Sequence, residues 1–73
     1  MRRYRIIDRC LKNSLRPYPS KKLLLEKMLE AGIDISGFQL DKDINFLRNE
    51  EDAPIEYDRK RNGYRYTDPE YSY

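Results

Sequence analysis

The sequence predicts a mostly α-helical domain that ends in a small β-hairpin. Three observations favour this fold class, and the first two are patterns of apolar residues: they recur every three or four positions over the first two thirds of the chain, and they alternate after about residue 54. The third is the length, since 73 residues leave room for one hydrophobic core and exclude a second independent one. We therefore expect one domain, with its helices first and its strands last.

The first predicted helix covers residues 3–13 and has a single apolar face. Tyr4, Ile7 and Leu11 are spaced by three and four residues, with arginines on the opposite side. The following residues 16–19 contain two prolines and cannot continue a helix, because proline lacks a backbone donor and restricts the residue before it. We expect a short extended connection there.

The second predicted helix begins after Ser20, whose hydroxyl can accept a hydrogen bond from an unpaired backbone N–H of the first turn. It ends at Gly32, which suits a left-handed cap. Its apolar stripe is formed by Leu24, Leu25, Met28 and Leu29.

The third predicted helix has the clearest local signal in the chain. Ser36 and Gln39 fit a capping box, in which each side chain bonds the other's backbone N–H. The helix fades into the acidic residues 50–52, which we expect to be solvated. Two helices joined by a tight turn that contains glycine are typical of a helix-turn-helix. The buried face of the third helix is predicted to consist of Leu40, Ile44 and Leu47.

Two short alternating segments, residues 55–58 and 64–67, predict the hairpin. Asn62 and Gly63 mark its turn, because both residues tolerate positive φ. A two-stranded hairpin alone is barely stable in water, so several tyrosines must pack on the helices. Three helices followed by such a hairpin make a winged helix-turn-helix.

The residue types exclude several kinds of site. The chain has no histidine and one cysteine, which rules out an intramolecular disulfide, a Cys/His zinc site and a Ser-His-Asp triad. The glycines are too scattered for a phosphate-binding loop, and the neighbouring carboxylates (Asp41 with Asp43, Glu50 with Glu51) have no converging third ligand. We expect no enzymatic activity, no metal and no cofactor.

The longest apolar run, residues 23–25, is too short for a membrane span or a signal peptide, so we expect a soluble cytoplasmic protein.

Charge is distributed unevenly along the chain although the net charge is only +2. Residues 1–22 carry eight Lys and Arg against one carboxylate, and residues 23–58 carry three against ten. Such segregation can create a strong local field that attracts a polyanion. A solvated surface of mixed ion pairs is the alternative interpretation.

The groups that could contact a DNA duplex occur at three places. On the third helix, Gln39 could bond adenine and Lys42 could bond guanine or a phosphate, while Gly37 would let the backbone approach closely. Lys21 and Lys22 lie beside the free N–H groups at the start of the second helix, a ready phosphate site. The hairpin loop adds a cluster that could follow the minor groove, formed by Arg59, Lys60 and Arg61.

The chain resembles a known family in two stretches. Residues 35–48 are similar to its recognition helix, and residues 53–58 together with Asn62-Gly63-Tyr64-Arg65-Tyr66 are similar to its wing. The family is the N-terminal winged-helix domain of bacterial WYL-domain transcriptional regulators, which are related to DeoR-type repressors. The resemblance implies sequence-specific binding of double-stranded DNA by a dimeric transcription factor. It also implies DNA contacts from Ser36, Gln39 and Lys42, and from the basic wing loop.

The chain departs from the family in two respects. Asp41 stands where many relatives carry a basic or neutral polar residue, and an aspartate near phosphates is repulsive unless it accepts a hydrogen bond from cytosine N4. The regulatory C-terminal portion of the family, which binds an effector, is not among the 73 residues. We expect residues 1–67 to be the DNA-binding domain and residues 68–73 to begin a linker. The full-length parent would be a homodimer, and the isolated domain a monomer or weak dimer.

Several residues also have a purely structural interpretation. Phe38 is either partly buried under the start of its helix or exposed toward thymine methyl groups. Cys10 is expected in the core rather than in redox chemistry, and Asp43 is expected to pair with an arginine. The tyrosines of the hairpin are expected to cover the core, and the arginines of residues 2–9 either contact flanking phosphates or are solvated.

An alternative function is a winged helix used for protein interaction or dimerisation without DNA binding, since this fold also serves as a docking surface. That alternative predicts an exposed apolar patch on the third helix or the wing. RNA binding is a third possibility and would require exposed aromatic side chains.

Overall fold

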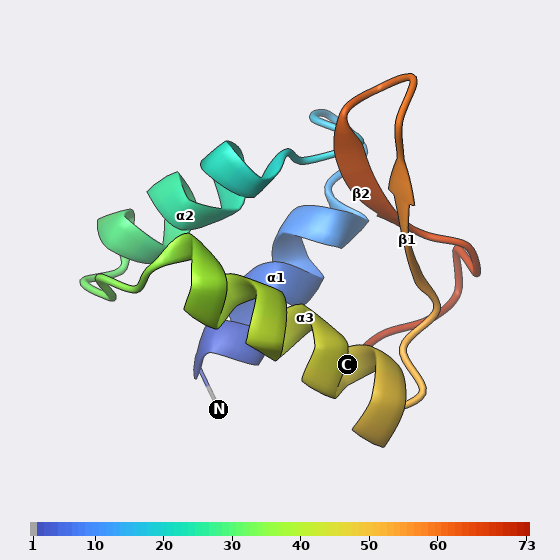
Figure 1. Ribbon diagram of the computed structural model, residues 1–73. Coiled ribbons are helices and arrows are strands. Elements are labelled where there is room, and N and C mark those ends of the chain that lie inside the picture. The colour runs from blue at the N-terminus through green and yellow to red at the C-terminus, as the bar shows by residue number, and fades with distance from the viewer. Residues whose placement is uncertain (1) are drawn as a thin grey trace.

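The computed structural model describes residues 2–73, which form three helices and one two-stranded antiparallel sheet (Figure 1). The helices are α1 (Arg2–Lys12), α2 (Lys21–Glu30) and α3 (Gly37–Glu50), and the strands are β1 (Ile55–Asp58) and β2 (Gly63–Tyr66). In Figure 1, α3 crosses in front of α1, with α2 and the hairpin on either side. The predicted fold class, three helices followed by a hairpin wing, is confirmed.

Both ends of α2 are capped as the sequence predicts. The Ser20 hydroxyl accepts the N–H of Leu23 at 3.1 Å. Gly32 has a φ of 81°, and it closes the helix with the paired hydrogen bonds of a Schellman motif. In that motif Gly32 N–H donates to the Leu29 carbonyl and Ile33 N–H donates to the Met28 carbonyl, each at 2.9 Å.

The N-terminus of α3 is capped by half of the predicted box. Ser36 Oγ accepts the Gln39 N–H at 3.1 Å. The reciprocal half is wrong, because the Gln39 side-chain amide turns to Asp43 instead, at 3.1 Å. A buried carboxylate that needs donors attracts that amide more strongly than an exposed backbone N–H does.

The core lies where the three helices meet the base of the hairpin. Ile7 comes from α1, Leu24 and Met28 from α2, and the predicted apolar face of α3 is buried as expected. Leu29 is the exception to the predicted stripe of α2, since its side chain is 61% exposed. Within residues 2–73, no helix is both long enough and apolar enough to cross a bilayer.

The hairpin pairs Ile55 with Tyr66 and Asp58 with Gly63. Asn62 has the positive φ predicted for the turn, 53°. The predicted turn is present, but Gly63 does not have a positive φ. Glycine is needed there for a different reason, since a Cβ would collide with the backbone carbonyl of Tyr18. The wing therefore packs directly against the connection between α1 and α2.

The hairpin tyrosines divide between packing and exposure. Tyr64 and Tyr66 pack against the core as predicted. Tyr57 is 45% exposed instead, and its ring contacts that of Tyr64 edge-on, with the ring centroids 5.1 Å apart. Residues 68–73 fold back on the domain, because Tyr71 also packs against the core and the Tyr73 N–H donates to Asp8 at 3.0 Å.

Candidate nucleic-acid interface

The outward face of α3 is a single row of exposed side chains. They recur at the helical spacings of four and three residues and lie directly opposite the buried face. The ring of Phe38 is 69% exposed, and the Lys42 ammonium lies 4.7 Å from its centroid. Phe38 is therefore exposed rather than tucked under the helix. The row consists of Phe38, Lys42, Asn45 and Asn49.

One flank of α3 faces α2 and the wing. Lys21 Nζ bonds Asp41 Oδ2 at 2.9 Å, and a Cβ at Gly37 would come within 2.9 Å of the Lys21 side chain. Asp41 is thus held by a lysine of the neighbouring helix, which neutralises much of the charge that would repel a phosphate. Lower on the same flank, Arg48 Nε donates to the Ile55 carbonyl at 3.0 Å.

The opposite flank of α3 faces α1 and is occupied by a buried ionic network. Asp43 is 1% exposed, and Arg3 donates to both of its oxygens, at 2.8 and 3.2 Å. The expected pairing of Asp43 with an arginine is confirmed. Arg3 is therefore not on the solvated side of α1. The network also orients Gln39 toward α1, away from the outward row of α3.

The N-terminus of α2 and the wing lie next to each other. Tyr64 N–H donates to the Pro19 carbonyl at 2.9 Å, immediately before α2 begins. Arg61 lies over the ring of Tyr18, 4.6 Å from its centroid, and also bonds Asp58 Oδ2 at 3.0 Å. These contacts place the start of α2, the first turns of α3 and the base of the wing loop on one side of the molecule.

The cations of the wing loop differ in their environments. Asp58 Oδ1 accepts the backbone N–H groups of Lys60 and Arg61 at 2.9 and 3.1 Å, which fixes the loop backbone. The Arg61 side chain is committed to Asp58. Arg59 and Lys60 are exposed and form no ion pair within residues 2–73, and the same holds for Lys22 on α2.

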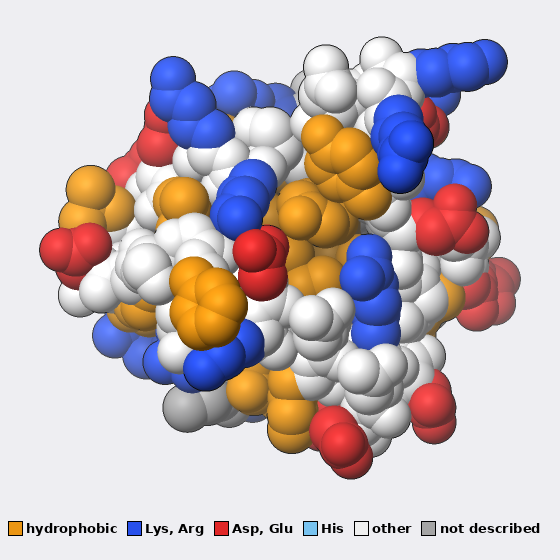
Figure 2. All heavy atoms as spheres, viewed as in Figure 1, with side chains coloured by type: hydrophobic (Ala, Val, Ile, Leu, Met, Phe, Trp, Pro, Cys, Tyr) orange, Lys and Arg blue, Asp and Glu red, His pale blue; other side chains and the backbone are white. Residues whose placement is uncertain are grey.

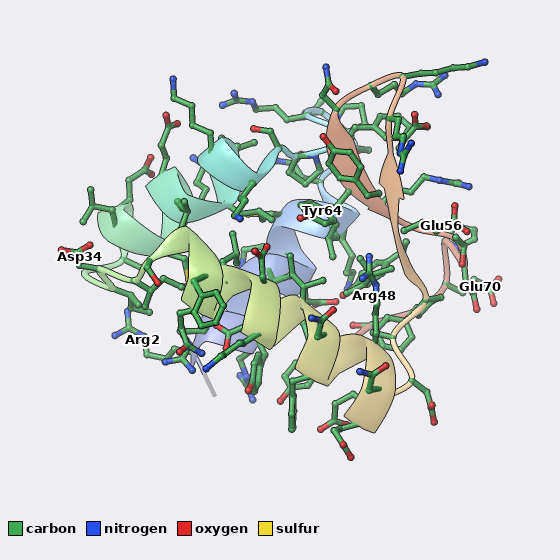
Figure 3. All side chains as sticks on the ribbon, viewed as in Figure 1. Arg2, Asp34, Arg48, Glu56, Tyr64 and Glu70 are labelled. Carbon is green, nitrogen blue, oxygen red and sulfur yellow. The ribbon has the colours of Figure 1, made fainter. Side chains whose placement is uncertain are left out.

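Figure 2 shows this side of the molecule with its charges. Lysine and arginine side chains lie over α2, beside α3 and at the tip of the wing, with carboxylates between some of them. In Figure 3, Arg48 and Tyr64 lie between α3 and the wing, whereas Arg2 lies at the far end of the molecule. There Arg2 donates to the Ala31 carbonyl at 2.9 Å.

The remaining cations of α1 are on another side. Tyr4, Ile7 and Leu11 turn inward, so Arg5, Arg9 and Lys12 point away from the core. The latter three line a shallow surface pocket together with Asp8, Asn13 and Tyr73, and no residue of α3 or of the wing contributes to it. The structure therefore separates Arg5 and Arg9 from the cations at the start of α2 and on the wing loop, so the positive charge of the N-terminal residues does not all converge on the face of α3.

Two groups of reactive type have structural roles. Cys10 is half-buried against the core, and burial raises the pKa of its thiol, which keeps it protonated. Tyr66 is half-buried as well, and its hydroxyl donates to Asp8 at 2.7 Å. Burial and that hydrogen bond both raise the pKa of Tyr66.

Of the predicted site residues, the structure places Lys21, Lys22, Gly37 and Lys42 on one side with the wing loop. Gln39 is turned toward α1, and the Ser36 hydroxyl caps its helix. Asn49 completes the outward row of α3 and was not singled out from sequence. Its spacing of four residues from Asn45 and seven from Lys42 is the signal that could have found it.

Comparison of the chain with protein-family models, with curated proteins and with solved structures found no match.

Proposed function

We propose that this chain is a sequence-specific, double-stranded DNA-binding domain of a transcriptional regulator, with α3 in the major groove and the wing on the flanking backbone or minor groove. One observation supports this most: the outward row of α3 is flanked on one side by cations of α2 and of the wing loop. A helix fits the major groove, and cations beside it would reach the phosphate backbone that borders the groove on that side.

The exposed residues of this face fall into two groups, those suited to contact phosphates and those suited to contact base edges. Lys22, Arg59 and Lys60 are exposed and unpaired within residues 2–73, so they are suited to phosphates. Lys42 and Asn45 point outward from α3 and can reach base edges, the first toward guanine and the second toward adenine. Gln39 would have to leave Asp43 to bond adenine through both of its amide atoms. The side-chain amide of Asn45 is therefore better placed than that of Gln39 to bond adenine.

The resemblance to WYL-domain regulators supports the same proposal and extends it. In a full-length parent of that kind, the domain would act in the cytoplasm as one half of a dimer and bind two half-sites. Asp41, the residue that departs from the family pattern, is compatible with this role because Lys21 holds its carboxylate.

Titration of the 73-residue chain against a random-sequence duplex at several salt concentrations tests the proposal. If about four to six phosphates are neutralised, log K falls with log salt at a slope of about −4 to −5. Replacement of Lys42 and Asn45 by alanine then reduces the preference for selected over random duplex, by about 1–3 kcal/mol for each bidentate interaction with a base that is removed. Affinity that does not change with salt would contradict DNA binding.

Protein interaction without DNA binding is the second candidate, and exposed apolar groups favour it. Phe38 on α3 and Tyr57 on the wing are 69% and 45% exposed. Leu29 also borders an open groove with Leu25, Ile33 and Ile35. This function predicts a concentration-dependent increase in mass by sedimentation, together with no salt-dependent affinity for duplex.

A further inference from the structure

Phe38 is an apolar side chain that contributes little to the fold. It lies in the first turn of α3 with 69% of its surface exposed, whereas Leu40, two residues later, is completely buried. Exposure of an aromatic ring to water is unfavourable in proportion to its apolar area. Removing this ring would therefore cost the fold little, and contact with a partner would gain from it.

The side chain of Lys42 lies against the ring of Phe38. Its ammonium lies 4.7 Å from the ring centroid, close enough for a cation–π interaction. The lysine covers one face of the ring and leaves the rest open. An apolar surface and a positive charge are therefore presented side by side, at two positions separated by one helical turn.

The surrounding charges indicate an anionic partner for this pair. Lys22 lies at the start of the neighbouring helix α2 and Arg59 and Lys60 are exposed on the wing loop, and none of the three forms an ion pair within residues 2–73. A partner that is polyanionic on its outside and also offers an apolar group to an inserted helix fits both properties. In the major groove of DNA, the apolar group at the base edges is the C5-methyl group of a pyrimidine.

We propose that Phe38 and Lys42 together read a C5-methylated pyrimidine next to a guanine. The Phe38 ring packs on the methyl group, and the Lys42 ammonium donates to O6 or N7 of the guanine. This inference rests on the proposed function and deepens it by naming the chemical group recognised. Thymine and 5-methylcytosine carry the same methyl group at the same edge, so the domain would distinguish uracil from thymine and cytosine from 5-methylcytosine.

The experiment uses a 20-base-pair duplex of TG repeats in one strand and CA repeats in the other. A second duplex replaces every thymine of the TG repeats by uracil. A third duplex has CG repeats with every cytosine replaced by 5-methylcytosine, and a fourth has the same repeats with unmodified cytosine, so the two members of each pair differ only in methyl groups. With the 73-residue chain, we expect the uracil duplex to bind about three- to fourfold more weakly than the thymine duplex, the factor for burial of one methyl group. The 5-methylcytosine duplex is expected to bind more tightly than its unmodified counterpart by a similar factor.

Three variants distinguish recognition of the methyl group from sequence-independent binding of the duplex. Phe38→Ala should bind both members of each pair with equal affinity and keep its salt dependence, and far-UV circular dichroism checks that it remains folded. Lys42→Gln should weaken binding to all four duplexes while the ratio within each pair persists. Leu15→Ala is the matched control, because Leu15 is a 91% exposed apolar side chain in the connection between α1 and α2, and it should change nothing.

The outcomes distinguish the two proposals. Equal affinity of the unmodified chain for the thymine and uracil duplexes, with salt-dependent binding retained, overturns methyl recognition and leaves DNA binding intact. A difference between these duplexes that survives in Phe38→Ala also overturns it. No salt-dependent affinity for any of the duplexes overturns the proposed function, and methyl recognition with it.

Discussion

The carboxylate of Asp43 accepts hydrogen bonds from the side chains of two other residues. This carboxylate is almost completely buried, and it accepts two hydrogen bonds from Arg3 and one from Gln39. Removing one partner of such a network leaves the others unsatisfied. The partners here come from α1 and α3, so the network joins the first helix to the third.

We predict that Asp43→Ala lowers the free energy of unfolding by about 1–3 kcal/mol, because Arg3 and Gln39 lose their shared acceptor inside the protein. The Arg3 side chain is 25% exposed and can partly turn to water, which limits the loss. Urea unfolding measures the effect. Asp41→Ala is the matched control: its pair with Lys21 is exposed, so a change of under about 1 kcal/mol is expected. Equal losses for the two variants would contradict this assignment.

Gly63 is constrained by close approach rather than by its φ. In Gly63→Ala the new methyl group meets the Tyr18 carbonyl, so the wing must shift away from the α1–α2 connection. We predict a loss of about 1–3 kcal/mol in the free energy of unfolding. Faster hydrogen exchange at the Tyr64 N–H should accompany it, since that group donates to Pro19.

Gly32→Ala is the comparison for that prediction, because Gly32 has open space around it and a positive φ. It should cost about 1 kcal/mol through backbone conformation alone, without any change in exchange at Tyr64. If hydrogen exchange at the Tyr64 N–H were equally fast in both variants, the packing explanation for Gly63 would be wrong.

At the scale of elements, the sequence was most informative where the determinants are local. The caps at Ser20, Gly32 and Ser36 depend on residues within five positions of one another, and all three are found in the structure. The direction of Gln39 depends on Asp43 and on Arg3, which is 40 residues from Asp43 in the chain. No helical period encodes such a contact, and the sequence therefore could not show that Gln39 turns away from the outward row.

The close approach of Gly63 to Tyr18 belongs to the same class of long-range determinants. Asn-Gly predicts a turn from local preferences, and the turn is present. The reason that glycine and no other residue fits is a backbone that passes nearby from 45 positions earlier in the chain. The exposure of Phe38 likewise depends on which sides of α3 its neighbours cover.

The wing is attached to α1 by a hydrogen bond with a predictable pH dependence. Tyr66 donates to Asp8, and burial together with this bond raises the pKa of Tyr66; burial also raises the pKa of Tyr64 and of Tyr71. The folded protein holds these protons more tightly than the unfolded chain does. As the pH rises above about 10, the unfolded state loses them first, so the free energy of unfolding falls.

We predict that Tyr66→Phe makes this alkaline loss of stability shallower, because the group with the most strongly raised pKa is gone. At neutral pH the variant should be less stable by about 1 kcal/mol, the usual contribution of one hydrogen bond. Urea unfolding at several pH values between about 7 and 11 checks both statements. The same alkaline slope in the variant and the unmodified chain would show that Tyr66 is not responsible.

At the scale of the whole molecule, two groups of cations lie on different sides. One consists of the cations at the start of α2 and on the wing loop, beside the outward row of α3. The other consists of Arg5 and Arg9, which point away from the core on the outer face of α1. A rigid duplex that contacts the first group would not reach the second, because the body of the domain lies between the outward faces of α3 and α1 (Figure 1).

The two groups should therefore contribute differently to duplex binding. We predict that the double variant Arg59→Gln, Lys60→Gln reduces the magnitude of the slope of log K against log salt by about 2, one unit for each phosphate that is no longer neutralised. The matched variant Arg5→Gln, Arg9→Gln removes the same charge from α1 and should leave the slope unchanged within about half a unit, with only a small general loss of affinity from the lower net charge. Equal decreases for the two variants would mean that the whole field of the protein attracts DNA without a defined face. A decrease confined to the α1 variant would place the duplex on the opposite side and overturn the role assigned to α3.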